Sequence, residues 1–145
     1  MRVLISRLRR DDAGASIVEF ALLAPAIIGM MLGVLQVGTA MQNYNALRNV
    51  SADVERYAMV QYATGNELTN SQLRNFAIAS AESTPYLLRS SSIAASVTDA
   101  ATQRVTGVTE KTLTMNYQIL GLFDAVGLRG PYITYTRPLF LATPS

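Results

Sequence analysis

One carboxylate and one candidate cleavage site are the residues best placed to do chemistry in this chain. Glu19 stands at the mouth of a long apolar run, and residues 20–47 contain no Asp, Glu, Lys or Arg. A charged side chain costs about 2.5–3.5 kcal/mol at the centre of a bilayer and less near its edge. A positive partner would explain Glu19, and cutting the chain between Gly14 and Ala15 would create one, the free amine of Ala15. The sequence therefore predicts cleavage at this bond and charge pairing at Glu19.

Other catalytic chemistry has little support. The chain has no cysteine and no histidine, which excludes disulfides, thiolate nucleophiles and the commonest zinc ligands. Lys111, the only lysine, could formally join a serine in a Ser-Lys dyad, but it lies in an alternating segment where a solvated lysine is ordinary. No phosphate-binding or dinucleotide-binding glycine pattern is present. We expect no enzymatic activity, no metal and no cofactor.

The composition points to one membrane segment and one small domain. Of the 145 residues, 50% are hydrophobic and only 15% are charged, against about 25% charged residues in soluble domains. A membrane segment of about 20–25 residues would leave roughly 100 for one domain. The net charge of +2 is too small to imply nucleic acid as a partner.

The apolar run at residues 20–39, FALLAPAIIGMMLGVLQVGT, has the length of a membrane-spanning helix, about 30 Å. It is too long and too far from Met1 for a simple secretory signal, and the Gly38-Thr39-Ala40 sequence only weakly imitates a signal peptidase site. The positive-inside rule places the N-terminus in the cytoplasm and the chain after about Met41 on the far side. This orientation depends on four arginines, the leader arginines: Arg2, Arg7, Arg9 and Arg10.

Small residues recur at steps of four along the apolar run. This small-residue stripe consists of Ala21, Pro25, Gly29 and Gly33. The two glycines form a G-x-x-x-G pair, which lets another helix approach closely, although glycines are common in membrane helices for other reasons. Pro25 cannot donate a hydrogen bond to the carbonyl of Ala21, so a bend or a locally melted turn is expected near residues 21–25.

Beyond the membrane, the pattern predicts an α+β head. Apolar residues at helical spacing extend the first helix to about Tyr62 (Leu47, Val50, Val54 and Tyr57), and Thr64-Gly65-Asn66 ends it. A capping box formed by Thr69 and Gln72 starts a second helix that ends by Pro85. Its expected buried face is Leu73, Phe76, Ala77 and Ala81.

The rest of the chain is expected to form two or three antiparallel strands. Alternation is clearest at residues 112–119, weaker at 93–97, and a run rich in Tyr and Thr follows at 132–137. Residues 90–92 are predicted to be a polar loop, and residues 120–130 either a short helix or a loop over the sheet. We expect three parts in the chain. Residues 1–14 are a leader, residues 15–62 are the long helix with its membrane segment, and residues 63–145 are the small α+β head.

The segment from Gly14 to Pro25, GASIVEFALLAP, resembles a type IV prepilin signature and, more narrowly, the TadE-like proteins of the tight-adherence (Tad/Flp) pilus. The similarity is specific from Gly14 to about Gly38. A weaker C-terminal pattern, a strand containing tyrosine followed by residues 127–131 and 132–137, is also similar. TadG-like relatives are usually much longer, so the chain length favours a TadE-like or TadF-like protein.

The resemblance implies a minor pilin or pseudopilin in the bacterial inner membrane, with a periplasmic head that can enter the surface pilus. A prepilin peptidase would remove residues 1–14, and Glu19 would pair with the amine of Ala15, often that of a neighbouring subunit. The implied partners are this peptidase, other pilin or pseudopilin subunits, the Tad secretion machinery and membrane lipid. Asp11 and Asp12 depart from the family pattern, because basic residues are more usual just before the cut.

Two other interpretations stay open at this point. An uncleaved single-span protein would keep Glu19 as an interfacial charge that reaches the lipid headgroups. A membrane-tethered enzyme is a further alternative, without a catalytic constellation to support it. The mass of the intact protein distinguishes the first alternative from a processed pilin.

Overall fold

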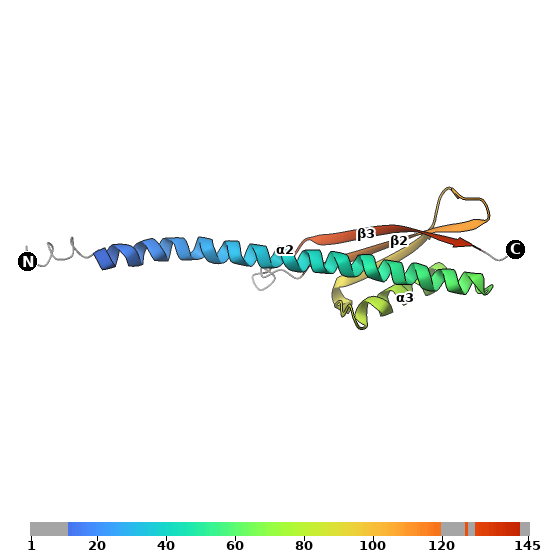
Figure 1. Cartoon of the computed structure of the whole chain (residues 1–145), viewed down its shortest axis with the longest axis horizontal. Coiled ribbons are helices and arrows are strands. Elements are labelled where there is room, and N and C mark those ends of the chain that lie inside the picture. The colour runs from blue at the N-terminus through green and yellow to red at the C-terminus, as the bar shows by residue number, and fades with distance from the viewer. Residues whose placement is uncertain (1–11, 120–126, 128–129, 143–145) are drawn as a thin grey trace, which may run out of the picture. The chain divides into compact units, whose positions relative to one another are not determined.

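The computed structural model describes residues 12–119, 127 and 130–142 (Figure 1). These residues form an α+β fold, as predicted, with a long N-terminal helix, one further α-helix and a three-stranded antiparallel sheet. The chain divides into two units, residues 1–37 and 38–145, and we call the second unit the head. The leader arginines, and all of the 120–130 segment except Gly127 and Gly130, lie outside the described residues.

Helix α2 comprises residues Asp12–Ala63. It is helical throughout residues 21–25, so the chain has no melted turn before Pro25, and of the two expected outcomes only a bend stays a prediction. Its C-terminus is close to the predicted position, since Gly65 adopts a left-handed φ of 81° and donates a backbone hydrogen bond of 3.0 Å to the carbonyl of Tyr62. A glycine just past a helix end is the usual residue for this conformation.

Helix α3, Asn70–Glu82, begins with the predicted capping box. The backbone N–H of Gln72 donates to the Thr69 hydroxyl, and the Thr69 N–H donates to the Gln72 side chain at 2.8 Å. The helix ends at Glu82, before Pro85. The predicted polar loop that follows contains instead a short 3-10 helix, η1 (Ser90–Ser92).

The sheet has the strand order β1-β2-β3, with β2 in the centre. Strand β1 is Ile93–Asp99, β2 is Val108–Gln118 and β3 is Tyr132–Ala142, so each is longer than its predicted segment. Alternation holds in β2, where Leu113, Met115 and Tyr117 are buried. The opposite face carries polar cross-strand pairs such as Thr134 with Asn116.

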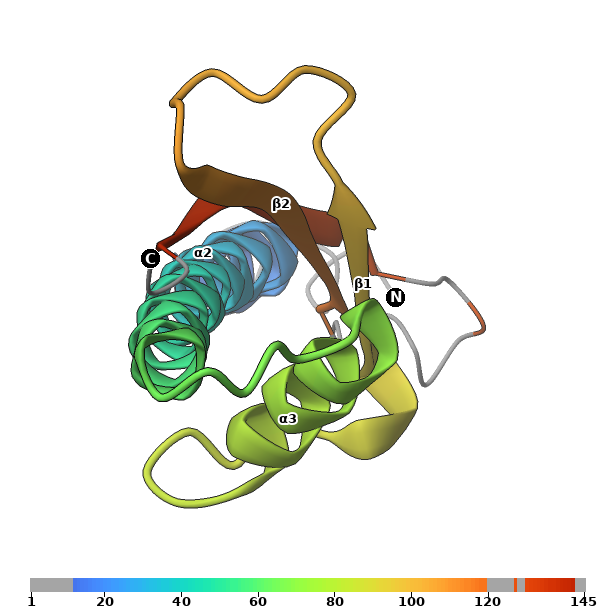
Figure 2. The same cartoon turned by 90° about the vertical axis from the view of Figure 1, so that its right-hand side faces the viewer.

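The core of the head lies between this sheet and the two helices, which cover the same face of the sheet (Figure 2). The predicted face of α2 is correct, because Leu47, Val50 and Val54 are fully buried. Leu73, Ala77 and Ala81 of α3 are buried opposite them, as predicted. Phe76 is only half-buried, and its ring stacks on that of Tyr57 with centroids 3.9 Å apart.

Candidate functional site

The predicted cleavage site lies in the first described turn of α2. The bond between Gly14 and Ala15 is helical, and both residues are exposed. A Cβ built on Gly14 would meet no atom within 4 Å. Glycine is a poor helix former because it loses more backbone freedom in a helix than other residues do. Local unwinding of this turn, which a protease cleft requires, is therefore inexpensive.

Glu19 is the only Asp, Glu, Lys or Arg between residues 13 and 47, and its side chain is exposed. Within the described residues it forms no ion pair. It follows Ala15 by four residues, about 6 Å along the helix axis. An amine at Ala15 would thus lie one turn away, on the same side of the helix.

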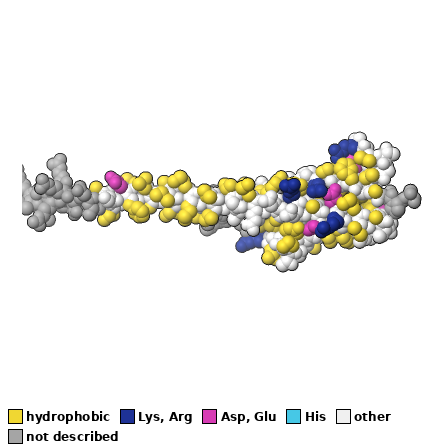
Figure 3. Space-filling view, viewed as in Figure 1, with side chains coloured by type: hydrophobic (Ala, Val, Ile, Leu, Met, Phe, Trp, Pro, Cys, Tyr) yellow, Lys and Arg dark blue, Asp and Glu magenta, His cyan; other side chains and the backbone are white. Residues whose placement is uncertain are grey.

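The apolar part of α2 has no cover from the rest of the described chain. The helix is long and apolar enough to cross a membrane, and the most apolar stretch of it is not buried at all. Figure 3 shows hydrophobic side chains along this part of α2. A fully exposed apolar surface of this length requires lipid or other protein around it. The helix is therefore consistent with a single membrane pass.

The small-residue stripe lies on this uncovered helix. Ala21, Pro25, Gly29 and Gly33 are all exposed, and Cβ atoms added at the two glycines would meet no atom within 4 Å. The surface at Gly33 is a shallow groove flanked by Met30, Val34 and Val37. Contact between this stripe and another helix stays a prediction.

The prediction that Lys111 is solvated is wrong. Its side chain lies on the core face of β2 and is only 9% exposed. The ammonium donates to Asp99 at 2.6 Å and to the side-chain oxygen of Asn70 at 2.8 Å. The hydrogen bond from Lys111, and after it a bond of 3.2 Å that the Asn70 amide donates to Asp99, hold the pKa of Asp99 below its usual value. Because the charge of Lys111 is used to join β1, β2 and α3, the geometry gives no support to a Ser-Lys dyad.

A second buried charge lies on the other face of β2. Glu110 is 3% exposed and accepts hydrogen bonds from the Arg104 backbone at 3.1 Å and from its side-chain Nε at 2.8 Å. The Arg104 guanidinium also lies over the Phe140 ring, and its hydrogen bonds lower the pKa of Glu110. This pair fixes the loop between β1 and β2. In the described residues no cluster of three or more acidic side chains could hold a metal.

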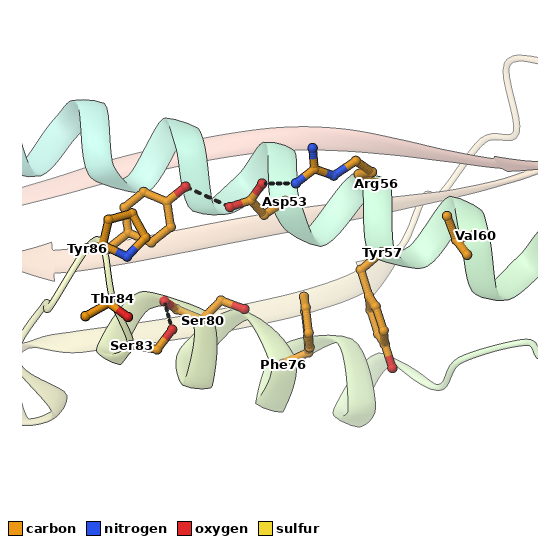
Figure 4. A pocket seen from close by; sticks show the side chains of 10 residues that line it. Asp53, Arg56, Tyr57, Val60, Phe76, Ser80, Ser83, Thr84 and Tyr86 are labelled. Carbon is orange, nitrogen blue, oxygen red and sulfur yellow. Dashed lines mark hydrogen bonds and ion pairs between the residues drawn. The ribbon is translucent and has the colours of Figure 1, made fainter.

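A surface groove of about 460 Å³ lies between α2, α3 and the loop after α3 (Figure 4). Asp53 accepts a hydrogen bond of 2.7 Å from the Tyr86 hydroxyl and one of 2.8 Å from Arg56. The bond to Asp53 raises the pKa of Tyr86. Sequence analysis missed this contact, because residues 33 positions apart carry no local signal of it. Asp53 therefore has its hydrogen-bond partners within the groove. Its bond with Tyr86 holds the loop after α3 against α2.

Comparison with known proteins agrees with the N-terminal signature. The family model described as "TadE-like protein" matches residues 14–56. No curated protein and no solved structure matches the chain. The matched segment starts at Gly14, contains Glu19 and the whole apolar run, and continues into the head. The suspected resemblance is confirmed, and it extends beyond Gly38, where the sequence signature became thin.

Proposed function

We propose that this chain, TadE-like over residues 14–56, is a minor pilin or pseudopilin that takes part in assembly of a Tad/Flp adhesion pilus. The family match indicates a protein associated with the Tad pilus. The observation that carries the finer proposal is a lone carboxylate, Glu19, on an uncovered apolar helix five positions after a glycine. We propose a structural role without enzymatic activity.

In this proposal a prepilin peptidase cuts between Gly14 and Ala15 on the cytoplasmic side of the inner membrane. The new amine of Ala15 and the carboxylate of Glu19 then form an ion pair within the chain or between neighbouring subunits. Removing one member of a buried ion pair leaves the other uncompensated, which is more costly than never forming the pair. The pair would therefore favour subunits that are correctly aligned along their helices.

Intact-mass and N-terminal sequencing of protein purified from cells that hold the peptidase test the processing step. We expect a chain that begins at Ala15. Gly14→Ala should be partly cut, whereas Gly14→Leu should block the cut. Gly38→Leu is a matched control, since Gly38 is also a helical glycine with open space around it. A wild-type chain that retains Met1 would instead favour an uncleaved single-span protein.

The pairing step is tested with Glu19→Ala and Glu19→Gln. Both variants should be inserted and cut normally but should lose surface pili and co-purification with pilin partners, because the charge is missing in each. Glu82→Gln removes one exposed carboxylate from the head and serves as the charge-matched control. Wild-type levels of pili and partners in both Glu19 variants would remove Glu19 from the mechanism.

A further inference from the structure

The head exposes four large apolar or aromatic side chains near its first residues. They come from α2, the loop before β1 and the start of β3, and their exposed fractions range from 43% to 66%. We call this set the exposed rim: Met41, Tyr44, Leu87 and Tyr132. Singly exposed apolar residues are ordinary, but a group of them at one end of a domain marks a contact surface.

The rim residues lie at one level of the head. Leu87 lines a concave surface together with Thr39 and Asn43 of α2. Ile133 lines another with Met41 and Tyr44, and Tyr132, the residue before it, lies on the outer face of β3. The start of β3 lies beside this part of α2 (Figure 1). Three segments far apart in sequence therefore meet at residues 39–45.

This level coincides with the end of the apolar run. Thr39 is the last residue of that run, and Tyr44 lies about 7.5 Å beyond it along the helix. The headgroup layer adds about 5–7 Å on each side of a bilayer core of about 30 Å. If residues 20–39 span the core, Met41 of α2 lies within the headgroup layer and Tyr44 at its outer edge, the region where tyrosines are enriched in membrane proteins.

We propose that the exposed rim is a membrane-docking surface, through which the head rests on anionic phospholipid. The nearby charges suit this partner. Arg48 follows Tyr44 by one helical turn, Arg89 follows Leu87 by two residues, and both are exposed. Residues 38–52 and 83–98 contain no acidic residue. Lipid phosphates would therefore meet only positive side chains in these two segments.

The backbone at Leu87 supports a contact outside the head. Its φ of 51° lies in the left-handed region, which glycine and asparagine adopt more readily than leucine. The side chain is 66% exposed, so it adds little to the packing of the head. Contact of the Leu87 side chain with an apolar surface outside the head would explain a leucine at this position. Membrane lipid could provide that surface.

The inference rests on the membrane span of the proposed function but on neither cleavage nor pilus assembly. The chain has no cysteine, so single-cysteine variants can carry an environment-sensitive fluorophore. Labels are placed at Leu87 and Tyr132 of the full chain in vesicles of phosphatidylcholine and phosphatidylglycerol that contain a lipid-borne quencher. Val105, 47% exposed in the loop between β1 and β2, is the matched control, and Val34 reports on the span.

We expect quenching at Leu87 and Tyr132 several-fold above that at Val105. Quenching at Val34 alone would overturn the docking surface and leave the membrane span intact. Absence of quenching at Val34 as well would overturn both. If protection of the rim labels increases with protein concentration at constant lipid, a second copy of the chain covers the rim and the proposal is wrong.

Leu87→Asn separates docking from folding. Asparagine suits the left-handed backbone, so the urea midpoint of the head should stay the same or rise, while quenching of a label at Tyr132 falls at least twofold. Vesicles without phosphatidylglycerol should also reduce this quenching. Unchanged quenching in the Leu87→Asn variant would show that Leu87 takes no part in docking and would overturn the assignment of the rim.

Discussion

Asp99→Asn should destabilise the head more than Lys111→Met, although the two residues form one ion pair. The pair is asymmetric, since the Lys111 side chain is 9% exposed and that of Asp99 is 64% exposed. Neutralising Asp99 leaves a buried ammonium that still donates to the side-chain oxygen of Asn70. Neutralising Lys111 leaves a carboxylate that water already solvates.

The free energy of unfolding that Asp99→Asn removes should lie between two limits. Breaking a fully buried pair costs about 3–5 kcal/mol, whereas an exposed pair contributes about 0.2–1 kcal/mol. With one partner buried and the other in solvent, we expect Asp99→Asn to cost about 1–2 kcal/mol. Lys111→Met keeps an apolar stem of similar length, so its effect should be within about 1 kcal/mol of zero in either direction. The double variant should recover most of the loss caused by Asp99→Asn.

Urea unfolding of the full chain in mild detergent, followed by the near-ultraviolet circular dichroism of its tyrosines, measures these differences. The pH dependence gives a second check. The pKa of Asp99 is lower in the folded head than in the unfolded chain, so its stabilisation is complete above about pH 4 and is lost as the pH falls through the folded pKa. Asp99→Asn should lack this component of acid sensitivity. A larger loss in Lys111→Met than in Asp99→Asn would refute the reasoning.

Three further predictions address the cap, the core and the orientation. Thr69→Ala removes the hydroxyl that accepts a hydrogen bond from the backbone N–H of Gln72 and should cost about 1 kcal/mol in the same unfolding assay. Leu113→Ala creates a cavity at a fully buried site and should cost about 2–5 kcal/mol, whereas the exposed control Thr98→Ala should stay within about 0.5 kcal/mol. Neutralising the four leader arginines together should scramble the topology, as read by protease accessibility of the head in spheroplasts; unchanged accessibility would contradict the predicted orientation.

Strand β3 shows where sequence patterns misjudge an element. The predicted segment, chosen for its Tyr and Thr content, stopped at Arg137, just before Pro138, a residue that cannot donate a ladder hydrogen bond. In the structure the strand continues through Pro138 to Ala142, and Leu139 and Leu141 are fully buried. β3 is an edge strand in the order β1-β2-β3, where a proline is tolerated. Edge or central position is a property of the sheet and cannot be read from the segment.

The features that the sequence determined by itself are local ones. The apolar run, the charge at Glu19, the capping box at Thr69 and the alternation in β2 each follow from residues a few positions apart, since helices and strands repeat over such short distances. Only the tertiary structure decided that Lys111 is buried, because its partners Asn70 and Asp99 come from α3 and β1. The same holds for the exposed rim, whose members meet through packing of the head, where contacts between distant segments carry no periodic signal in the chain.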